Sequence, residues 1–317
     1  MPLVTSKEML IKATNEGYAV GAFNANNMEF VQAVIEMADE MKSPVILQIS
    51  QGAIKYAGLE FATSLVRIAA ELASVPVALH LDHGTDFEQN VLCLRAGFTS
   101  LMFDGSALPL DENIRVTRKI TEIAHACGIP VESELGKIPK IEDNLTEQQV
   151  DDLMANPEDA QRFVEETQCD SLAAAIGSVH GMKEDIQPLD IGRLDEIRRR
   201  TSVPIVLHGS SGVLRTRKDA EEKGIRLKDH QGTVEDAIKH GVAKINVATE
   251  LSLTFIRGIK AALDKNPGEK DMRKILLPAK EAVKASVRGY IELFGSAGKA
   301  EVVGASGLTG SEIKYHE

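Results

Sequence analysis

Three histidines, His83, His180 and His208, each stand directly before a glycine at the end of an apolar run. Neutral imidazole is a favoured zinc ligand, and three protein ligands with one open position form the usual catalytic zinc site. Zinc in such a site acts as a Lewis acid on a carbonyl or enolate oxygen. A single histidine at a strand end is more often a hydrogen-bonded structural residue. Three in matching positions favour a metal site.

Four carboxylates accompany these histidines, namely Asp82, Asp104, Glu132 and Glu134. Asp82 adjoins a predicted zinc ligand and is either a general acid/base or a residue that orients the imidazole. Asp104 and Glu134 either hold a second cation or form ion pairs and helix caps. Glu132 and Glu134 share one face if their strand is regular. His80 lies inside an apolar run, and we expect it to be a hydrogen-bonded core residue.

A candidate phosphate site follows His208, where the sequence reads Gly-Ser-Ser-Gly. Backbone N–H groups in such a turn can approach a phosphate closely. The loops after strands seven and eight of an α/β barrel commonly form a phosphate site, and the second loop here is Asn246–Thr249. Gly-Ser clusters also occur in ordinary turns, so the two loops together carry the argument. Neither GxxxxGK[ST] nor GxGxxG is present, which argues against the common nucleotide sites.

These residues can meet only in a fold whose strand ends converge. Eight short apolar runs alternate with segments of helical spacing, which predicts parallel strands with crossover helices. We expect a (β/α)8 TIM barrel with extra C-terminal helices, in which all these residues lie at the carboxyl ends of the strands. An open doubly wound sheet is the structural alternative. The expected strands are Ala19–Ala25, Pro44–Ser50, Val75–His80, Ser100–Asp104, Pro130–Glu134, Ser171–Ile176, Val203–His208 and Lys244–Val247.

Two segments are longer than a barrel requires. Lys137–Asn156 follows the fifth strand and is long enough to act as a lid, with a short helix at Glu147–Met154. Leu251–Phe294 has helical spacing, and we expect it to cover the barrel or to form a subunit contact. We expect residues 1–294 to form one barrel domain and residues 295–317 to form a mobile tail. Among the other expected helices are Asp86–Ala96, Asp111–Cys127, Pro157–Thr167 and Asp190–Thr201.

Composition and charge exclude several classes of protein. The net charge of −11 and the absence of Trp argue against nucleic-acid binding. The sequence has no apolar run of about 18 residues, so we expect no membrane span. It shows no signal peptide, and we expect a cytoplasmic protein. The 3 cysteines are widely spaced and odd in number, so we expect small buried residues rather than a disulfide framework.

With these residues assembled, the sequence resembles the class II fructose-bisphosphate and tagatose-bisphosphate aldolases along nearly its whole length. The resemblance implies a zinc-dependent lyase that reversibly cleaves fructose 1,6-bisphosphate or tagatose 1,6-bisphosphate to dihydroxyacetone phosphate and glyceraldehyde 3-phosphate. Homodimers or homotetramers are usual in such proteins. The matching stretches are GAFNANN near Asn24, HLDHG at 80–84, DGS at 104–106, ESELG at 132–136, IEDN at 141–144, AIGSVHG at 175–181, LHGSSG at 207–212 and KINVATEL at 244–251.

The resemblance also implies individual roles. Zn²⁺ would be held by His83, His180 and His208. A second divalent or a monovalent cation is implied as well, and a second or alternative metal position would be served by Asp104 and Glu134. Asp82 would exchange the proton of the C4 hydroxyl, and Glu142 would exchange the proton next to the carbonyl of dihydroxyacetone phosphate. Substrate binding would fall to Asn24, Ser50, Gly181, Gly209, Ser210, Ser211, Asn246, Val247, Ala248 and Thr249.

Departures from the family pattern leave the aldehyde partner open. Ala248 and Ser252 stand where fructose-specific members often carry Asp and Arg, and Ala107 replaces a usual His. The alternative is a related class II aldolase with another aldehyde, of the deoxy-keto-gluconate phosphate or sulfo-sugar phosphate type. Otherwise Arg257, Arg288 or a residue from a neighbouring subunit supplies the missing cation. A zinc hydrolase or isomerase and a sugar-phosphate-binding regulator are the rival functions.

Overall fold

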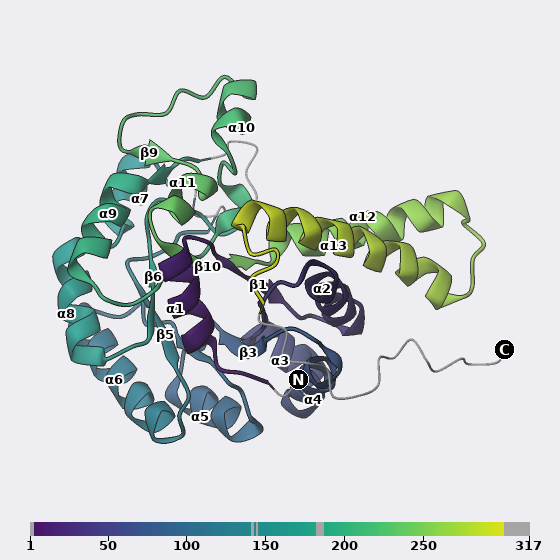
Figure 1. Cartoon of the computed structure of the whole chain (residues 1–317), viewed down its shortest axis with the longest axis horizontal. Helices are drawn as coiled ribbons and strands as arrows, with labels where there is room; N and C mark the ends of the chain where they lie inside the picture. Colours follow the sequence, from purple (N-terminus) through teal and green to yellow (C-terminus); the bar gives the residue numbers. More distant parts are fainter. Residues whose placement is uncertain (1–2, 141–142, 144, 182–186, 301–317) are drawn as a thin grey trace.

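The structure, a computed structural model, describes residues 3–140, 143, 145–181 and 187–300. Its main sheet has eight strands in the order β3-β2-β1-β10-β8-β6-β5-β4. Parallel bridges between His80 and Ser100 and between Gly84 and Phe103 join β3 to β4, so the sheet closes into a barrel surrounded by helices (Figure 1). The open doubly wound alternative is therefore wrong. The barrel strands are β1 (Val20–Asn24), β2 (Val45–Ser50), β3 (Val77–Asp82), β4 (Leu101–Phe103), β5 (Val131–Leu135), β6 (Ser171–Ala174), β8 (Ile205–Leu207) and β10 (Val242–Val247).

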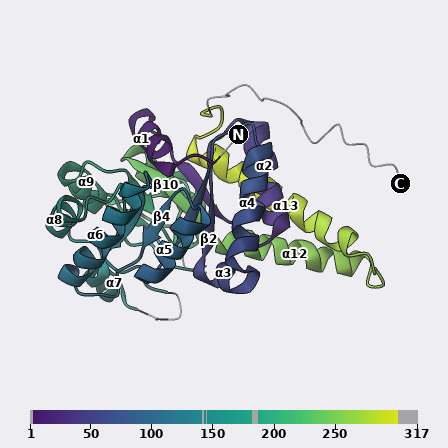
Figure 2. The same ribbon diagram turned by 90° about the horizontal axis from the view of Figure 1, so that it is seen from below.

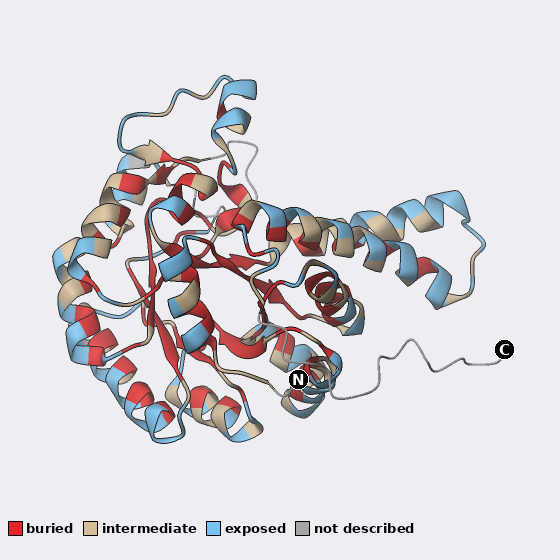
Figure 3. Ribbon diagram, in the orientation of Figure 1, coloured by how far each residue is buried: buried red, intermediate tan, exposed pale blue. Residues whose placement is uncertain are grey.

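The eight predicted strands are confirmed, with ends shifted by about two residues or fewer. Such short runs are read as strands because they are apolar and β-branched and lie between turn residues. Nearly every residue of these strands is buried (Figure 3). Parallel strands in a barrel are covered on one face by helices and on the other by the interior, which explains the near-continuous apolar runs.

The predicted helices are also present, with capping residues that fix their ends. Asn156 caps the helix that begins at Pro157, and its side chain accepts hydrogen bonds from the backbone N–H groups of Glu158 and Asp159. Asp86 and Asp190 are the capping residues of their helices rather than the first helical residues. The helices are α1 (Ser6–Glu16), α2 (Met28–Met41), α3 (Gln51–Ala57), α4 (Leu59–Leu72), α5 (Phe87–Ala96), α6 (Leu110–Ala126), α7 (Glu147–Leu153), α8 (Pro157–Thr167), α9 (Ile191–Arg200), α10 (Arg217–Glu222), α11 (Val234–Lys239), α12 (Thr249–Lys265) and α13 (Met272–Phe294).

Helix α1 closes the amino-terminal end of the barrel. It lies across the barrel axis in Figure 1, and its Met9, Leu10 and Ala13 are buried against residues of the strands such as Val20 and Ala243. Access to the barrel interior is therefore from the opposite end, where the strand carboxyl termini and their loops lie.

Helices α12 and α13 form a hairpin that extends well beyond the barrel (Figure 2). The two helices approach closely at Gly258, where an added Cβ would lie 2.6 Å from the Cα of Ala279. Helix α13 then returns to pack beside α2 and the barrel. Residues 295–300 of the predicted tail contact the barrel, where the N–H of Ala300 donates to the carbonyl of Lys42 at 2.9 Å. Residues 301–317 lie outside the described residues.

Three smaller observations complete the comparison with the sequence. A separate antiparallel pair, β7 (Leu189–Asp190) and β9 (Gln231–Gly232), was not predicted. All three cysteines are free, but Cys127 is exposed, so the expectation that each is buried is wrong for that residue. No helix among the described residues is both long and apolar enough to span a membrane.

Candidate metal centre and active site

The three predicted zinc ligands lie together at the carboxyl end of the barrel. The ring centroids of His83 and His208 are 4.8 Å apart, those of His83 and His180 are 5.2 Å apart, and those of His180 and His208 are 6.4 Å apart. These residues follow β3, β6 and β8, whose carboxyl ends face the same opening. The barrel therefore assembles three imidazoles that are far apart in the sequence.

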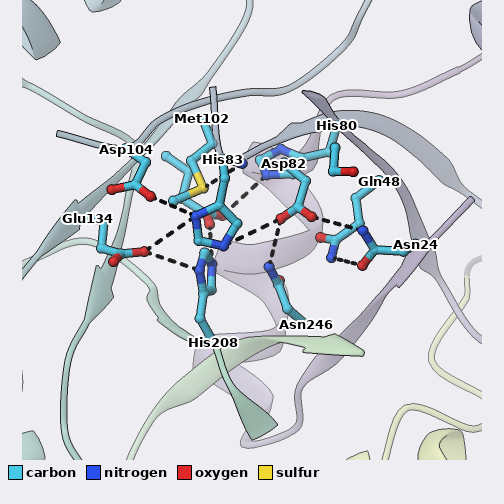
Figure 4. Close-up of polar contacts among 12 residues, drawn as sticks. Asn24, Gln48, His80, Asp82, His83, Met102, Asp104, Glu134, His208 and Asn246 are labelled. Carbon is cyan, nitrogen blue, oxygen red and sulfur yellow. Dashed lines mark hydrogen bonds and ion pairs between the residues drawn. The ribbon is translucent and has the colours of Figure 1, made fainter. Parts of the chain in front are cut away.

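Glu134 on β5 belongs to the same cluster (Figure 4). One ligand atom each from His83, Glu134 and His208 lies within 4.8 Å of the other two. His180 stands beside this group through its ring contacts. The four side chains offer three nitrogen donors and a carboxylate, which is a donor set that zinc accepts.

The contact between His208 and Glu134 shows that the cluster fits a cation. His208 Nε2 donates to Glu132 Oε1 at 2.8 Å, whereas its Nδ1 has no hydrogen-bond partner among the described residues. Glu134 Oε2 also lacks a partner there, although it is buried and lies 3.3 Å from that nitrogen. Buried polar atoms are nearly always paired. A metal ion bound by both atoms would satisfy them.

His83 is held in a fixed orientation. Its Nδ1 donates to Asp104 Oδ2 at 2.8 Å, and Asp104 Oδ1 accepts from the N–H and Oγ of Ser106. This leaves His83 Nε2 facing Asp82 Oδ1 at 3.9 Å. The backbone of His83 is left-handed, with φ of 51°, a conformation that non-glycine residues adopt mostly at functional or strained positions. In the described structure Asp104 thus orients an imidazole, as carboxylates beside metal ligands commonly do.

The electrostatics of the cluster favour bound positive charge. Burial alone would lower the pKa of His83, but the hydrogen bond to Asp104 and the nearby Asp82 and Glu134 raise it to about 10. Burial also opposes ionisation of Asp82, yet His83 and the other neighbouring positive groups hold its pKa below its usual range. By contrast, burial and the neighbouring imidazoles lower the pKa of His180 to about 3. Asp82 therefore remains ionised, and a bound cation would replace a proton on His83.

Asp82 is clamped by two amides. Asn24 Nδ2 donates to Asp82 Oδ2 at 2.9 Å, and Asn246 Nδ2 donates to Asp82 Oδ1 at 3.2 Å. Gln48 Nε2 in turn donates to Asn24 Oδ1 at 2.7 Å and fixes that amide (Figure 4). Asp82 is 5% exposed and lies beside the imidazoles. A carboxylate so placed can accept a proton from a substrate hydroxyl at the metal centre.

The two predicted phosphate loops are joined to each other. Ser210 Oγ donates to the carbonyl of Asn246 at 2.7 Å, which ties the loop after β8 to the end of β10. Gly209 has φ of +64°, and a Cβ there would lie 2.9 Å from the carbonyl oxygen of Val179. Only glycine fits this turn without displacing the backbone beside His180.

The remaining predicted substrate residues surround these loops. Ser50 ends β2 level with Asp82, and its Oγ caps α3 by accepting from the N–H of Ala53 at 3.3 Å. Val247 is the last residue of β10 and is buried. Ala248 precedes α12 and gives no side-chain cap, so the N–H groups of the first turn stay available for an anion. The others are Gly181 after His180, Ser211 in the turn Ser210–Gly212, and Thr249 at the start of α12.

The predicted lid begins beside the metal centre. The N–H of His180 donates to the carbonyl of Pro139 at 2.9 Å, and Lys140 forms a bridge with His180. Glu142, the predicted acid/base of this loop, lies outside the described residues. Helix α7 is present as predicted and begins with a capping box at Thr146.

Sequence reasoning missed two polar residues inside the barrel, Gln48 and Lys244. Both are fully buried, at 0% exposure. Each lies two residues before a strand-end position, so strand alternation places it on the same face, one layer deeper. That spacing was a usable signal.

The expectations for two other residues hold, because His80 is a buried residue hydrogen-bonded to Ser100, and Glu132 points inward like Glu134.

Comparisons with known proteins agree with this geometry. A family model described as Fructose-bisphosphate aldolase class-II matches residues 4–299. The fructose-bisphosphate aldolase of Thermus caldophilus is 48% identical over 305 residues, covering 94% of this chain and 100% of that protein. The fructose-bisphosphate aldolase of Helicobacter pylori strain J99 is 42% identical and covers 94% and 99%. The crystal structure of the YdjI aldolase from Escherichia coli K12 has a TM-score of 0.77 at 35% identity and covers 94% and 100%. The chain therefore belongs to the class II fructose-bisphosphate aldolase family, and it is a lyase with a (β/α)8 barrel.

Proposed function

We propose that this protein reversibly cleaves a ketose 1,6-bisphosphate, fructose or tagatose 1,6-bisphosphate, to dihydroxyacetone phosphate and glyceraldehyde 3-phosphate. The observation that carries the proposal is the group of three imidazoles in which two buried atoms, His208 Nδ1 and Glu134 Oε2, face each other without a hydrogen-bond partner among the described residues. Asp82 lies beside this group and is held by two amides. The relatives named fructose-bisphosphate aldolase support the choice of substrate class.

We assign the metal as Zn²⁺, held by His83, His180 and His208, with Asp104 and Glu134 serving a second or alternative position. A divalent cation bound there supplies Lewis-acid stabilisation of negative charge on the substrate carbonyl oxygen. The chain itself binds and orients the triose-phosphate half. For this we propose the N–H groups and hydroxyls of two joined loops, contributed by Gly181, Gly209, Ser210, Ser211, Asn246, Val247, Ala248 and Thr249.

Asp82 moves the first proton in the cleavage direction. It accepts the proton of the C4 hydroxyl, the C3–C4 bond breaks, and the C4 oxygen becomes the aldehyde carbonyl. The electron pair of the broken bond stays on the triose-phosphate half, and Glu142 then donates a proton to that carbon. Asn24 and Asn246 hold Asp82 as an ionised acceptor for this transfer, while Ser50 lines the adjacent wall. The loop that carries Glu142 excludes water when it closes.

The aldehyde end of the pocket is less charged than the family pattern would suggest. Ser252 Oγ accepts from Asn26 Nδ2 at 3.4 Å, so two uncharged side chains meet where related enzymes carry a cation. Arg288, one predicted substitute, is paired with Glu40 on α2. Arg257 lies near enough to Glu250 to help lower the pKa of that carboxyl, although burial opposes the shift. This observation favours a second candidate, condensation of dihydroxyacetone phosphate with a different aldehyde.

Metal removal tests the main proposal. The protein is treated with a chelator, its metal content is verified, and cleavage of fructose and tagatose bisphosphates is measured before and after Zn²⁺ is returned. We expect activity to disappear and to return with the metal. Full activity in the verified metal-free protein would exclude the mechanism. A panel of aldehydes condensed with dihydroxyacetone phosphate then separates the two candidates.

A variant of the loop tests the second proton transfer. Glu142→Ala should bind Zn²⁺ as tightly as the wild type but should exchange the carbon-bound proton of dihydroxyacetone phosphate with solvent much more slowly. General acid–base groups typically contribute about 100- to 10,000-fold, so the exchange rate should fall by an amount in that range. A Glu142→Ala protein that lacks metal contradicts the assignment.

The homodimeric or homotetrameric state and the cytoplasmic location remain predictions.

A further inference from the structure

A lysine ammonium lies in the centre of the barrel, directly beneath the metal centre. Lys244 on β10 is fully buried, and its Nζ lies 2.8 Å from Glu132 Oε2 and 3.0 Å from Glu132 Oε1. Glu132 Oε1 also accepts the Nε2–H of His208 at 2.8 Å. One carboxylate therefore connects the ammonium to an imidazole of the metal centre.

The position of Lys244 follows from strand alternation. Asn246 and Glu134 lie in the layer that contains the metal centre, and Lys244 and Glu132 lie two residues earlier on the same faces of β10 and β5. Neither residue is at a strand end. Their place is the layer below, where a TIM barrel is normally filled by branched apolar residues.

Three polar atoms surround the ammonium of Lys244, namely the two oxygens of Glu132 and one nitrogen of His80. An ammonium has three donors and no acceptor, and here the third donor faces His80 Nε2 at 3.4 Å. His80 Nε2 must then be the unprotonated nitrogen, and His80 Nδ1 donates to Ser100 Oγ at 2.7 Å. Ser100 Oγ is in turn 2.8 Å from Ser6 Oγ on α1. A continuous buried chain thus runs from α1 to the metal centre.

The same network fixes the tautomer of His208. The carboxylate of Glu132 accepts a hydrogen bond from Lys244 at Oε1 and forms an ion pair with it at Oε2, so the nitrogen of His208 that faces Oε1 must carry the proton. The other nitrogen, Nδ1, lies 3.3 Å from Glu134 Oε2 and is then the one that would give up a proton to bind a cation. The nitrogen left free by such a second hydrogen bond is the one that binds a metal.

We propose that Lys244 is a positioning residue of the metal centre, which holds Glu132 in place so that His208 presents Nδ1 to the cation. This inference rests on the proposed function, because it requires a metal at the three histidines. The ammonium of Lys244 contacts Glu132 and His80. Its effect passes through one carboxylate and one imidazole.

Removing Lys244 has two opposite effects on metal affinity, so the direction of the measured change tests the proposal. An ammonium below the site repels a cation through space, so removing it would tighten metal binding if charge alone mattered. Removing it also frees Glu132 Oε2 and releases the side chain that orients His208, which weakens metal binding. Loss of partners of this kind typically costs about 10- to 100-fold in metal affinity. We infer that the second effect is the larger.

The experiment compares full-length Lys244→Met with the wild type. Zn²⁺ affinity is measured by competition with a chromogenic chelator, and Co²⁺ is used to record the visible absorption spectrum of the substituted centre. We expect about 10- to 100-fold weaker Zn²⁺ binding and an altered Co²⁺ spectrum. Ser6→Ala, at the far end of the same hydrogen-bonded chain, is the matched control and should keep the wild-type affinity and spectrum. Equal or tighter Zn²⁺ binding by Lys244→Met would overturn the proposal.

A second comparison covers the case in which Lys244→Met does not fold, because it leaves a buried carboxylate unpaired. Glu132→Gln and the double variant Lys244→Met/Glu132→Gln both lack that carboxylate, and the double variant contains neither buried charge. If Lys244 acts through Glu132, the two proteins bind Zn²⁺ equally. A tighter-binding double variant means that Lys244 acts through space and overturns the inference. A wild-type protein that binds no divalent metal would instead overturn the proposed function itself.

Discussion

Replacing Asp82 with asparagine should separate the chemistry of this carboxylate from its packing. Asp82 accepts one hydrogen bond from Asn24 and one from Asn246. In Asp82→Asn one oxygen becomes an NH2 group that faces a donor, and an unsatisfied buried donor costs about 1–3 kcal/mol. Asn246 can remove this cost, because its Oδ1 has no partner among the described residues and its amide is free to flip. Asn24 cannot flip, since Gln48 holds its Oδ1.

The expected stability change is therefore small, whereas the expected loss of activity is large. We expect the free energy of unfolding to change by about 1 kcal/mol or less, because the flipped Asn246 restores both hydrogen bonds. An amide cannot accept the hydroxyl proton, and general-base catalysis contributes about 100- to 10,000-fold. That range corresponds to about 3–5 kcal/mol in the activation barrier. The metal content should be unchanged, because the three imidazoles remain.

The assay combines steady-state cleavage of the bisphosphate, metal analysis and thermal unfolding. Asp170→Asn serves as the control, since Asp170 is also a nearly buried carboxylate but bonds the N–H of Val131 at the other end of β5. The control should lose stability and keep its activity. A kcat of Asp82→Asn within tenfold of the wild type would refute the role of Asp82. A loss of more than about 3 kcal/mol in stability would refute the argument about the Asn246 amide.

Three further variants test the phosphate loop, an ion pair and the aldehyde end. Gly209→Ala should raise KM several-fold, because the added Cβ would lie 2.9 Å from a backbone oxygen. Gly224→Ala is the control, since its Cβ meets nothing within 4 Å and the variant should lose only stability. Equal KM values for the two variants in kinetic assays would contradict this prediction. Arg215 lowers the folded-state pKa of Glu250 despite burial, so their pair stabilises the protein above pH 4.5 and is lost as pH falls through the lowered pKa. Glu250→Gln should then reduce Tm at pH 7 and reduce it less at pH 3, and an equal reduction at both would refute the pairing. Ser252→Lys should favour phosphorylated over unphosphorylated aldehydes in condensation assays, and an unchanged preference would place the aldehyde phosphate elsewhere.

The sequence was sufficient for the barrel because each strand is a short apolar run between turn residues. This local pattern is strong for strands that are buried on both faces. The pair β7 and β9 was missed because strands of 2 residues are too short to show alternation. The ends of helices were predictable where Asp, Asn or Pro stood at the start, as at Pro157.

The sequence was enough to predict which residues form the candidate site, but not which of their atoms are in contact. Placing histidines at strand ends was enough to bring three imidazoles together. The unpaired contact of Glu134 with His208 depends on the stagger between β5 and β8, which no local pattern reveals. Strand alternation indicates the face on which Gln48 and Lys244 lie, but it does not reveal which residues they contact. Their roles depend on partners that are distant in sequence.

The amino-terminal helix α1 has a consequence for anyone preparing shortened forms of this protein. It closes the end of the barrel opposite the active site, because Met9 and Leu10 cover the amino-terminal ends of the strands and Ser6 bonds to Ser100. Deleting it would expose the apolar residues at these strand ends to water. A segment far from every reacting atom is thus one that crystallisation or expression trials should leave intact.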